Sequence, residues 1–281
     1  MSNENRTAER GGPQGSAGLE RVESFVATGP VNARINSTSG GVAVRTGEGL
    51  IVEVTLVASS SKNEHFLKSA HVSFDVATNQ LDIHTHPRDM GWNSLGSKKR
   101  KGSWFDFGGS DLDVVVRIPR ASSVTIKTMS GHTTVEGPTK EIGVSSMSGD
   151  VDVSESCDAL DVRTASGDVR TGVVRDLLKC KSASGNVQCG AAAKKTEISS
   201  ASGDVELYAN QAGKVTVKVV SGDVRLRVAA GLLVDVNAST VSGDMSSNID
   251  LDGAGAPRDN EVPLELHVTT VSGDVRIDKA S

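Results

Sequence analysis

Asp82, His84 and His86 are the residues whose types and spacing most resemble a metal site. They occupy alternate positions in QLDIHTH, residues 80–86. Because alternate residues of a β-strand point to the same face, they could offer one oxygen and two nitrogen ligands. Leu81 and Ile83 would then face inward, and exposed polar positions on a half-buried strand explain the same pattern. We therefore expect no cofactor and treat the three residues as weak metal candidates.

A second candidate site lies between residues 88 and 110, a loop with half of the chain's aromatic residues beside a basic run. Basic residues flanked by aromatic ones can bind anionic lipid headgroups or single-stranded nucleic acid. A solvated hairpin tip whose aromatic side chains fold back over the protein is the alternative. The candidate binding residues of this loop are Trp92, Lys98, Lys99, Arg100, Lys101, Trp104, Phe105 and Phe107.

The composition limits the partners and the compartment. The formal net charge of −5 over 281 residues makes nucleic acid an unlikely global partner. Residues 1–18 are polar and lack the apolar core of a secretory signal, and no later segment is apolar over enough of its length to span a bilayer. We expect a cytoplasmic protein with a disordered tail over residues 1–18.

The elements that must carry these sites are set by a repeated corner motif, Ser-Gly followed mostly by Asp. Its glycines are separated by intervals of 18, 18, 18, 18, 19, 21 and 30 residues. A near-constant period of this size is typical of a stacked repeat. The predicted turn glycines are Gly131, Gly149, Gly167, Gly185, Gly203, Gly222, Gly243 and Gly273.

Apolar residues recur at alternate positions on both sides of each corner, so each copy predicts strand, corner, strand. The predicted inward columns before the corner are Val124, Ile142, Leu160, Leu178, Thr196, Val215, Val236 and Leu266, then Ile126, Val144, Val162, Cys180, Ile198, Val217, Ala238 and Val268. The columns after it are Thr133, Val151, Val169, Val187, Val205, Val224, Met245 and Val275, then Val135, Val153, Thr171, Cys189, Leu207, Leu226, Ser247 and Ile277.

These columns predict an all-β fold, a parallel β-solenoid of about eight rungs and roughly 40 Å in length. An N-terminal β cap over 19–120 would precede it, with a degenerate first rung at 31–44 and the loop at 88–110. The regular solenoid would span 121–281, with 248–263 looped out. The period permits two or three faces per rung. The chain ends soon after Val275 and Ile277, so we expect the open, growing end there.

Stacking would align the corner carboxylates, which repel one another by roughly 1 kcal/mol at about 5 Å. Hydrogen bonds from backbone N–H groups could offset this repulsion and lock the turns, whereas a calcium ladder lacks the glycine-rich nonapeptide of calcium-binding β-rolls. The column consists of Asp150, Asp168, Asp204, Asp223, Asp244 and Asp274, interrupted by His132 and Asn186.

The three cysteines are too few for a disulfide scaffold, so we expect reduced thiols. Cys180 and Cys189 fall in inward columns, whereas Cys157 falls outside them and is expected near a corner, accessible to solvent. Long parallel β-helices can also be polysaccharide lyases, whose sites need converging carboxylates and basic residues. The outward basic residues here read as scattered, which favours a protein that is not an enzyme: Lys127, Arg163, Lys181, Lys218, Arg225 and Arg227.

Over residues 20–281 the sequence resembles a bacterial β-strand-repeat family of unknown function, the adhesin-labelled toast-rack domain. The resemblance rests on VATGPVNARINSTSGGVAVRTG, on DLDVVVRIPRASSVTIKTMSG and on the SGDV copies that follow. It implies a right-handed stacked-strand module, usually noncatalytic and often beside membrane segments in envelope-stress sensing.

We therefore expect a noncatalytic cytoplasmic scaffold or adaptor that binds unknown protein partners, with the Trp- and Lys-rich loop as the contact and a link to envelope stress. One alternative is a self-assembling filament, in the manner of bactofilin-type β-helices, that joins end to end. Another is an adhesin or a binder of anionic membrane surfaces that docks through the loop.

Overall fold

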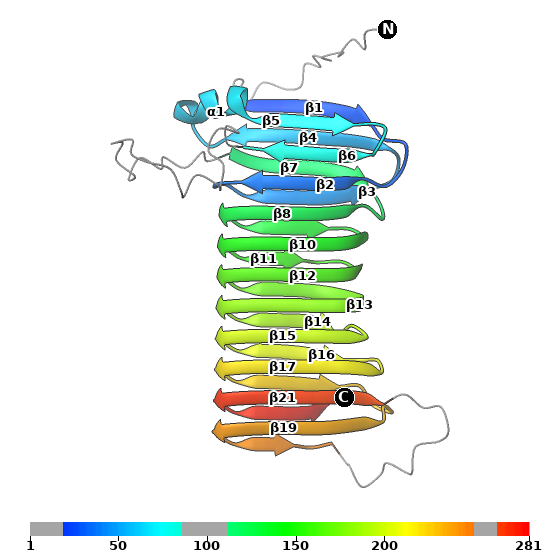
Figure 1. Ribbon diagram of the computed structural model, residues 1–281, viewed down its shortest axis with the longest axis vertical. Coiled ribbons are helices and arrows are strands. Elements are labelled where there is room, and N and C mark those ends of the chain that lie inside the picture. Colours follow the sequence, from blue (N-terminus) through cyan, green and yellow to red (C-terminus); the bar gives the residue numbers. More distant parts are fainter. Residues whose placement is uncertain (1–18, 86–111, 250–262, 281) are drawn as a thin grey trace, which may run out of the picture.

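The computed structural model describes residues 19–85, 112–249 and 263–280, which wind into a two-sided stack of β-strands (Figure 1). The predicted tail at 1–18, the binding loop from Trp92 to Phe107, His86 and most of the predicted insertion at 248–263 lie outside the described residues. Within the described ranges, no helix combines the length and apolar composition needed to cross a bilayer.

Sheet B forms one side of the stack, and its strands pair in parallel except for β5 with β6. In spatial order it contains β5 (His71–Asp75), β6 (Gln80–His84), β2 (Asn32–Ser37), β8 (Ser123–Ser130), β10 (Thr139–Ser148), β12 (Cys157–Ser166), the second half of β13 (Val169–Ser184), β15 (Lys195–Ser202), β17 (Gly213–Ser221), β21 (Leu264–Ser272) and β19 (Val234–Ser242).

Sheet A forms the other side, so each rung has two faces. Its strands in spatial order are β1 (Glu20–Val26), β4 (Ile51–Ala58), β7 (Leu112–Pro119), β3 (Val42–Gly47), β9 (Thr133–Glu136), β11 (Val151–Val153), the first half of β13, β14 (Val187–Ala191), β16 (Val205–Ala209), β18 (Val224–Val228), β22 (Val275–Lys279) and β20 (Met245–Ser247). β1 with β4 and β4 with β7 are antiparallel, and the other pairs are parallel.

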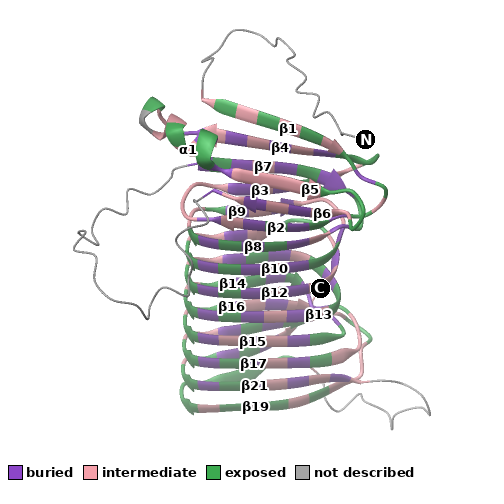
Figure 2. Ribbon diagram, turned by 45° about the horizontal axis from the view of Figure 1, so that its top comes forward, coloured by how far each residue is buried: buried purple, intermediate pink, exposed green. Residues whose placement is uncertain are grey.

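The core lies between the two sheets, where alternate residues of each strand meet (Figure 2). Val124, Ile142, Leu160 and Leu178 are each no more than 2% exposed, as the period-2 pattern predicts. The predicted inward columns are buried in every rung but one. In that rung Val236 and Ala238 are only partly buried, and Met245 and Ser247 are exposed.

The exception arises because the rungs do not stack in chain order. β21 pairs with β17 on one side and with β19 on the other, and β22 likewise lies between β18 and β20. Figure 1 shows the red β21 between β17 and the orange β19. The prediction that Val275 and Ile277 form the open end is therefore wrong: they are 1% and 3% exposed. The terminal rung is β19 with β20.

The opposite end also departs from chain order. β2 and β3 form a rung that stacks directly on β8 and β9, while β6 and β7 pair with the outer side of that rung. A short 3-10 helix (Ser61–Asn63) and α1 (Glu64–Ser69) follow β4. Arg21 on β1 holds this helix, because its guanidinium donates to the carbonyls of Leu67 and Ala70 at 2.8 Å each.

Candidate interaction surfaces

The corner between the sheets is built by the repeated Ser-Gly motif. The eight predicted turn glycines have φ between 115° and 141°, a region that L side chains rarely adopt. The glycines also stack on one another: a Cβ on Gly167 would lie 2.4 Å from the carbonyl oxygen of Gly149. Glycine is therefore required here by backbone conformation and by close approach of the next rung.

The corner carboxylates form a ladder of hydrogen bonds that runs along the solenoid. The Oδ1 atom of Asp150 accepts from the backbone N–H of Asp168, and the Oδ1 of Asp168 accepts from the N–H of Asn186, each at 2.9 Å. The same bond links the later corners in spatial order, through Asn186, Asp204, Asp223, Asp274 and Asp244. Backbone donors thus compensate the aligned carboxylates, and the side chains lock the turns.

A second row of side chains supports each corner from the strand before it. In seven rungs a buried hydroxyl donates to the carbonyl of the corner serine two residues later, at 2.9 to 3.4 Å: Ser37, Thr128, Ser146, Thr164, Ser182, Ser200 and Thr270. We did not predict this row, although the recurring Ser or Thr two residues before the Ser-Gly pair is visible in the sequence.

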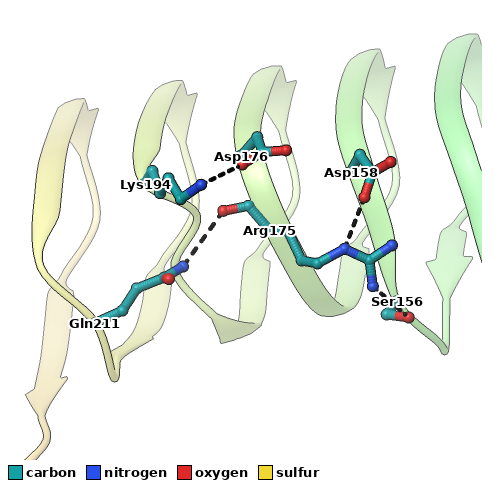
Figure 3. A network of polar contacts seen from close by, with 6 residues as sticks. All are labelled: Ser156, Asp158, Arg175, Asp176, Lys194 and Gln211. Atoms are coloured by element: carbon teal, nitrogen blue, oxygen red, sulfur yellow. Dashed lines mark hydrogen bonds and ion pairs between the residues drawn. The ribbon is translucent and has the colours of Figure 1, made fainter.

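The opposite edge of the solenoid carries paired charges (Figure 3). Arg175 Nε donates to Asp158 Oδ1 at 2.6 Å, and Lys194 Nζ donates to Asp176 Oδ1 at 2.8 Å. The amide of Gln211 donates to the carbonyl of Ala192 at 2.7 Å. Each contact joins residues 17 to 19 positions apart, so these side chains link successive rungs.

A shallow polar groove runs along the outside of sheet A, beside the corner ladder. Successive rungs contribute Arg170, Gln188, Glu206 and Arg225 to its lining, together with corner residues such as Asp168 and Asp204. The groove therefore offers both hydrogen-bond donors and acceptors to a partner.

The outside of sheet B gathers basic residues into one line. Lys127, Arg163, Lys181 and Lys218 share a single column across paired strands, so the prediction that the outward basic residues are scattered is wrong for these four. Parallel in-register stacking brings them together, since residues of equal phase in each repeat line up. Arg225 and Arg227 lie on sheet A.

The open end at β19 and β20 exposes apolar side chains. Met245, at an inward position, is 55% exposed, whereas the equivalent Val275 of the next rung is 1% exposed; the outward Val241 is 82% exposed. Figure 2 shows β19 at the end of the stack, without the buried segments that mark its neighbours. The outer edge of this rung pairs with no other described strand.

The weak metal candidates lie on the outside of sheet B near its N-terminal end. Asp82 and His84 are partly buried on β6, with Leu81 and Ile83 fully buried on the inward side. Asp82 accepts a hydrogen bond from Gln80 at 2.7 Å, and the His84 ring lies 6.3 Å from that of His71. Among the described residues, no three His, Cys, Asp or Glu side chains gather closely enough to hold a metal ion.

All three thiols are buried, so the prediction of an accessible Cys157 is wrong. Cys157 begins β12, where it pairs with Thr139 and Val174 and points into the core, adding an inward position before the predicted columns. Burial raises the pKa of Cys157 and of Cys189 to about 11, and burial also raises the pKa of Cys180. These thiols are poor nucleophiles at neutral pH.

Comparison with known proteins finds a matching family model and structures of similar fold. The family model described as Toastrack DUF4097 matches residues 32–278. The crystal structure of a "putative adhesin" from Bacteroides fragilis matches with a TM-score of 0.51 and 13% identity, over 95% of this chain and 100% of that chain. At this identity the likeness shows a shared fold. No curated protein matches the sequence.

Two further structures are less similar. A "putative lipid binding protein" from Parabacteroides distasonis has a TM-score of 0.41 and 11% identity, over 94% of this chain and 98% of that one. A "putative cell adhesion protein" from Clostridium sporogenes has a TM-score of 0.34 and 11% identity, over 93% and 99%.

Proposed function

We propose that this chain, which belongs to the Toastrack DUF4097 family, is a noncatalytic scaffold that binds protein partners along the outside of its β-solenoid. The observation that carries the proposal is the polar groove on sheet A. One register column of its lining presents a cationic, an amide, an anionic and a cationic side chain in turn, namely Arg170, Gln188, Glu206 and Arg225. Such a surface can pair with the polar groups of a protein segment laid along it.

The rigidity of the groove supports this function. The strands beneath it, from β13 to β18, are joined by in-register parallel pairing, and the hydrogen bonds of the Asp ladder fix the corner residues that line it. A surface that is already ordered loses little conformational entropy when a partner binds. We further propose that the protein works in the cytoplasm, where buried thiols stay reduced, and that its scaffold function is linked to envelope stress.

Site-specific photo-crosslinking tests the scaffold in cells of the source organism. A photoreactive amino acid at Gln188, in the groove, should capture a defined protein partner. The same group at Lys194, on the charge-paired opposite edge, is the matched control and should not. Capture of the same proteins from both positions, or of none from Gln188, would contradict the proposal.

A second candidate function, self-association, is favoured by the open rung at β19 and β20. An unpaired strand edge beside exposed apolar side chains is a template for another chain. A second solenoid end can cover both sheets and the core between them at once. The predicted filament would thus grow from β19, and not from the end of the chain.

Sedimentation velocity over a concentration series tests this second candidate. The variant V241K/M245K places charges on exposed positions of the terminal rung and should abolish any association. V220K, which alters a 55% exposed valine of an interior rung, is the control and should leave association intact. A wild-type protein that stays monomeric throughout the series would exclude self-association.

A further inference from the structure

Two straight rows of side chains run side by side along the outer margin of sheet B. The basic row contains Lys127, Arg163, Lys181 and Lys218. The other positions of the column are Ser145, Ser199, Thr269 and Ser239, and, beyond Lys127, Asn36, His84 and His71. The apolar row stands two positions later in each strand, next to the corner, and consists of Met129, Met147, Ala165, Ala183, Ala201, Val220, Val271 and Val241. No acidic residue occurs in either row.

The three lysines of the basic row are available to a ligand. Within the described part of the chain, Lys127, Lys181 and Lys218 form no ion pair and are exposed. The acids in the neighbouring column already have partners: Asp161 pairs with Arg163 at 3.2 Å, and Glu197 pairs with Lys195 at 2.9 Å.

On two other outer surfaces, basic residues form ion pairs. On sheet A, Arg227 pairs with Glu206 at 2.7 Å, and on the opposite edge Lys194 pairs with Asp176 at 2.8 Å. Among the described residues, sheet B thus carries a line of three unpaired lysines on a chain whose formal net charge is −5.

The geometry of the basic row fits an extended anionic surface. Lys127 and Lys218 are five strand steps apart, which corresponds to roughly 24 Å at the usual strand spacing. Because parallel strands keep them in register, the cations lie in a line on one sheet face. A small anion would contact one or two of them, whereas a surface of many anions can contact the three unpaired lysines at once.

The apolar row indicates which kind of extended anionic surface would bind. Met147, Val220 and Val271 are 54%, 55% and 47% exposed, on the same face as the lysines. A soluble polyanion provides no apolar layer for these side chains. A bilayer of anionic lipids provides phosphates at its surface and hydrocarbon directly beneath.

We infer that the paired basic and apolar rows of sheet B dock the solenoid on an anionic lipid bilayer. The lysines contact the headgroups, and the methionine and valine side chains enter the interfacial layer. This inference goes beyond the scaffold function, because it assigns a second surface and a second class of partner. The groove on sheet A faces away from the bilayer and stays free for protein.

Vesicle co-sedimentation of the full chain tests the inference. The wild type should pellet with phosphatidylglycerol–phosphatidylcholine vesicles at low salt, and not with phosphatidylcholine alone. The variant K127Q/K181Q/K218Q should bind about 100-fold more weakly, from about 1 kcal/mol for each lysine near an anionic surface. The control K68Q/K140Q/K279Q removes the same charge from exposed lysines elsewhere and should bind like the wild type.

Two further variants identify the surface and the ligand. M129S/M147S/V220S should also weaken vesicle binding, by about tenfold, because apolar side chains no longer enter the interface. K98Q/K99Q/K101Q changes the predicted binding loop and should have no effect.

Four outcomes would overturn the inference. They are no binding by the wild type, equal loss in the K68Q/K140Q/K279Q control, loss only in the loop variant, and loss with the lysine variant alone. The last outcome, joined with tight binding to soluble polyphosphate, would identify a soluble polyanion as the ligand. Crosslinking at Gln188 reports separately on the scaffold, so the two proposals can fail independently.

Discussion

The Oδ1 atom of Asp223 accepts a hydrogen bond from the backbone N–H of Asp274 at 2.9 Å, although the two residues are 51 positions apart. Asp244, which comes next in the repeat after Asp223, instead donates its N–H to Asp274. The final rung of the chain is thus inserted between two earlier rungs, and the corner ladder continues through it without a break.

Disulfide trapping checks this rung order. Lys218 and Thr269 are register partners, so K218C/T269C should form a disulfide under mild oxidation. K218C/S239C should not, because Lys218 and Ser239 are separated by β21 and lie roughly 10 Å apart. The three native thiols are buried and give little background. Efficient trapping of the second pair would mean that the rungs stack in chain order.

The ladder depends on an acceptor oxygen more than on a charge. Asp204→Ala should lower the free energy of unfolding by about 1 kcal/mol, since the N–H of Asp223 loses its partner. Asp204→Asn should cost much less, because the natural Asn186 already accepts this bond from Asp204 at 2.9 Å. Urea unfolding of both variants provides the measurement, and equal losses would show that the carboxylate charge matters instead.

Close stacking makes the corner glycines more sensitive than other glycines with positive φ. Gly167→Ala should cost more than about 2 kcal/mol, from backbone strain and from the approach to the Gly149 carbonyl. Gly49 has φ 92° and nothing within 4 Å of an added Cβ, so Gly49→Ala carries the strain alone and should cost about 1 kcal/mol. Similar thermal shifts for the two variants would argue against stacking.

The buried thiols predict a loss of stability at high pH. Cys157 and Cys189 have pKa values raised to about 11 from an ordinary value of 9.0, so between these pH values the unfolded chain releases protons that the folded chain retains. The free energy of unfolding should fall over that window, by up to about 1.4 kcal/mol per pH unit for each thiol, and should be unaffected below pH 9.0.

Reaction with a thiol-reactive dye at pH 8, a value below the ordinary thiol pKa, tests the burial of the thiols directly. The three buried thiols of the native protein should react slowly with the dye, whereas all three should react rapidly when the chain is unfolded in guanidinium chloride. One rapid equivalent in the native state, lost on Cys157→Ser, would restore the prediction of an accessible Cys157.

The all-β fold and its inward residues could be predicted because the repeat determines which residues of each strand face the core. Val124 and Ile142 are one period apart and both face inward, and only a shift by one residue would reverse this. Spatial order was not predictable from the same pattern. The strands that begin at Val275 and at Met245 follow the same corner motif, and either one could pair in register with β18. Periodicity therefore cannot choose between them.

The surfaces were less accessible to sequence reasoning than the core. Lys127 and Lys181 are far apart in the chain, and they form one row only because the stacking turns equal phase into proximity. Cys157 was misplaced because the strand begins before the two columns used to define it, and an extra inward position precedes Leu160. The inward columns could be derived from short windows, but these outward features require several rungs at once.

The insertion of β21 and β22 has a consequence for biosynthesis. Stacking that proceeds rung by rung as the chain emerges can be completed only as far as β18 until β21 and β22 have been synthesised, because these strands follow β19 and β20 in the chain. Meanwhile β19 can occupy the vacant edge of β17 in the same parallel register and must leave again before β21 enters. This rod is therefore completed only after β21 and β22 have been synthesised and any β19 that occupies the edge of β17 has left it.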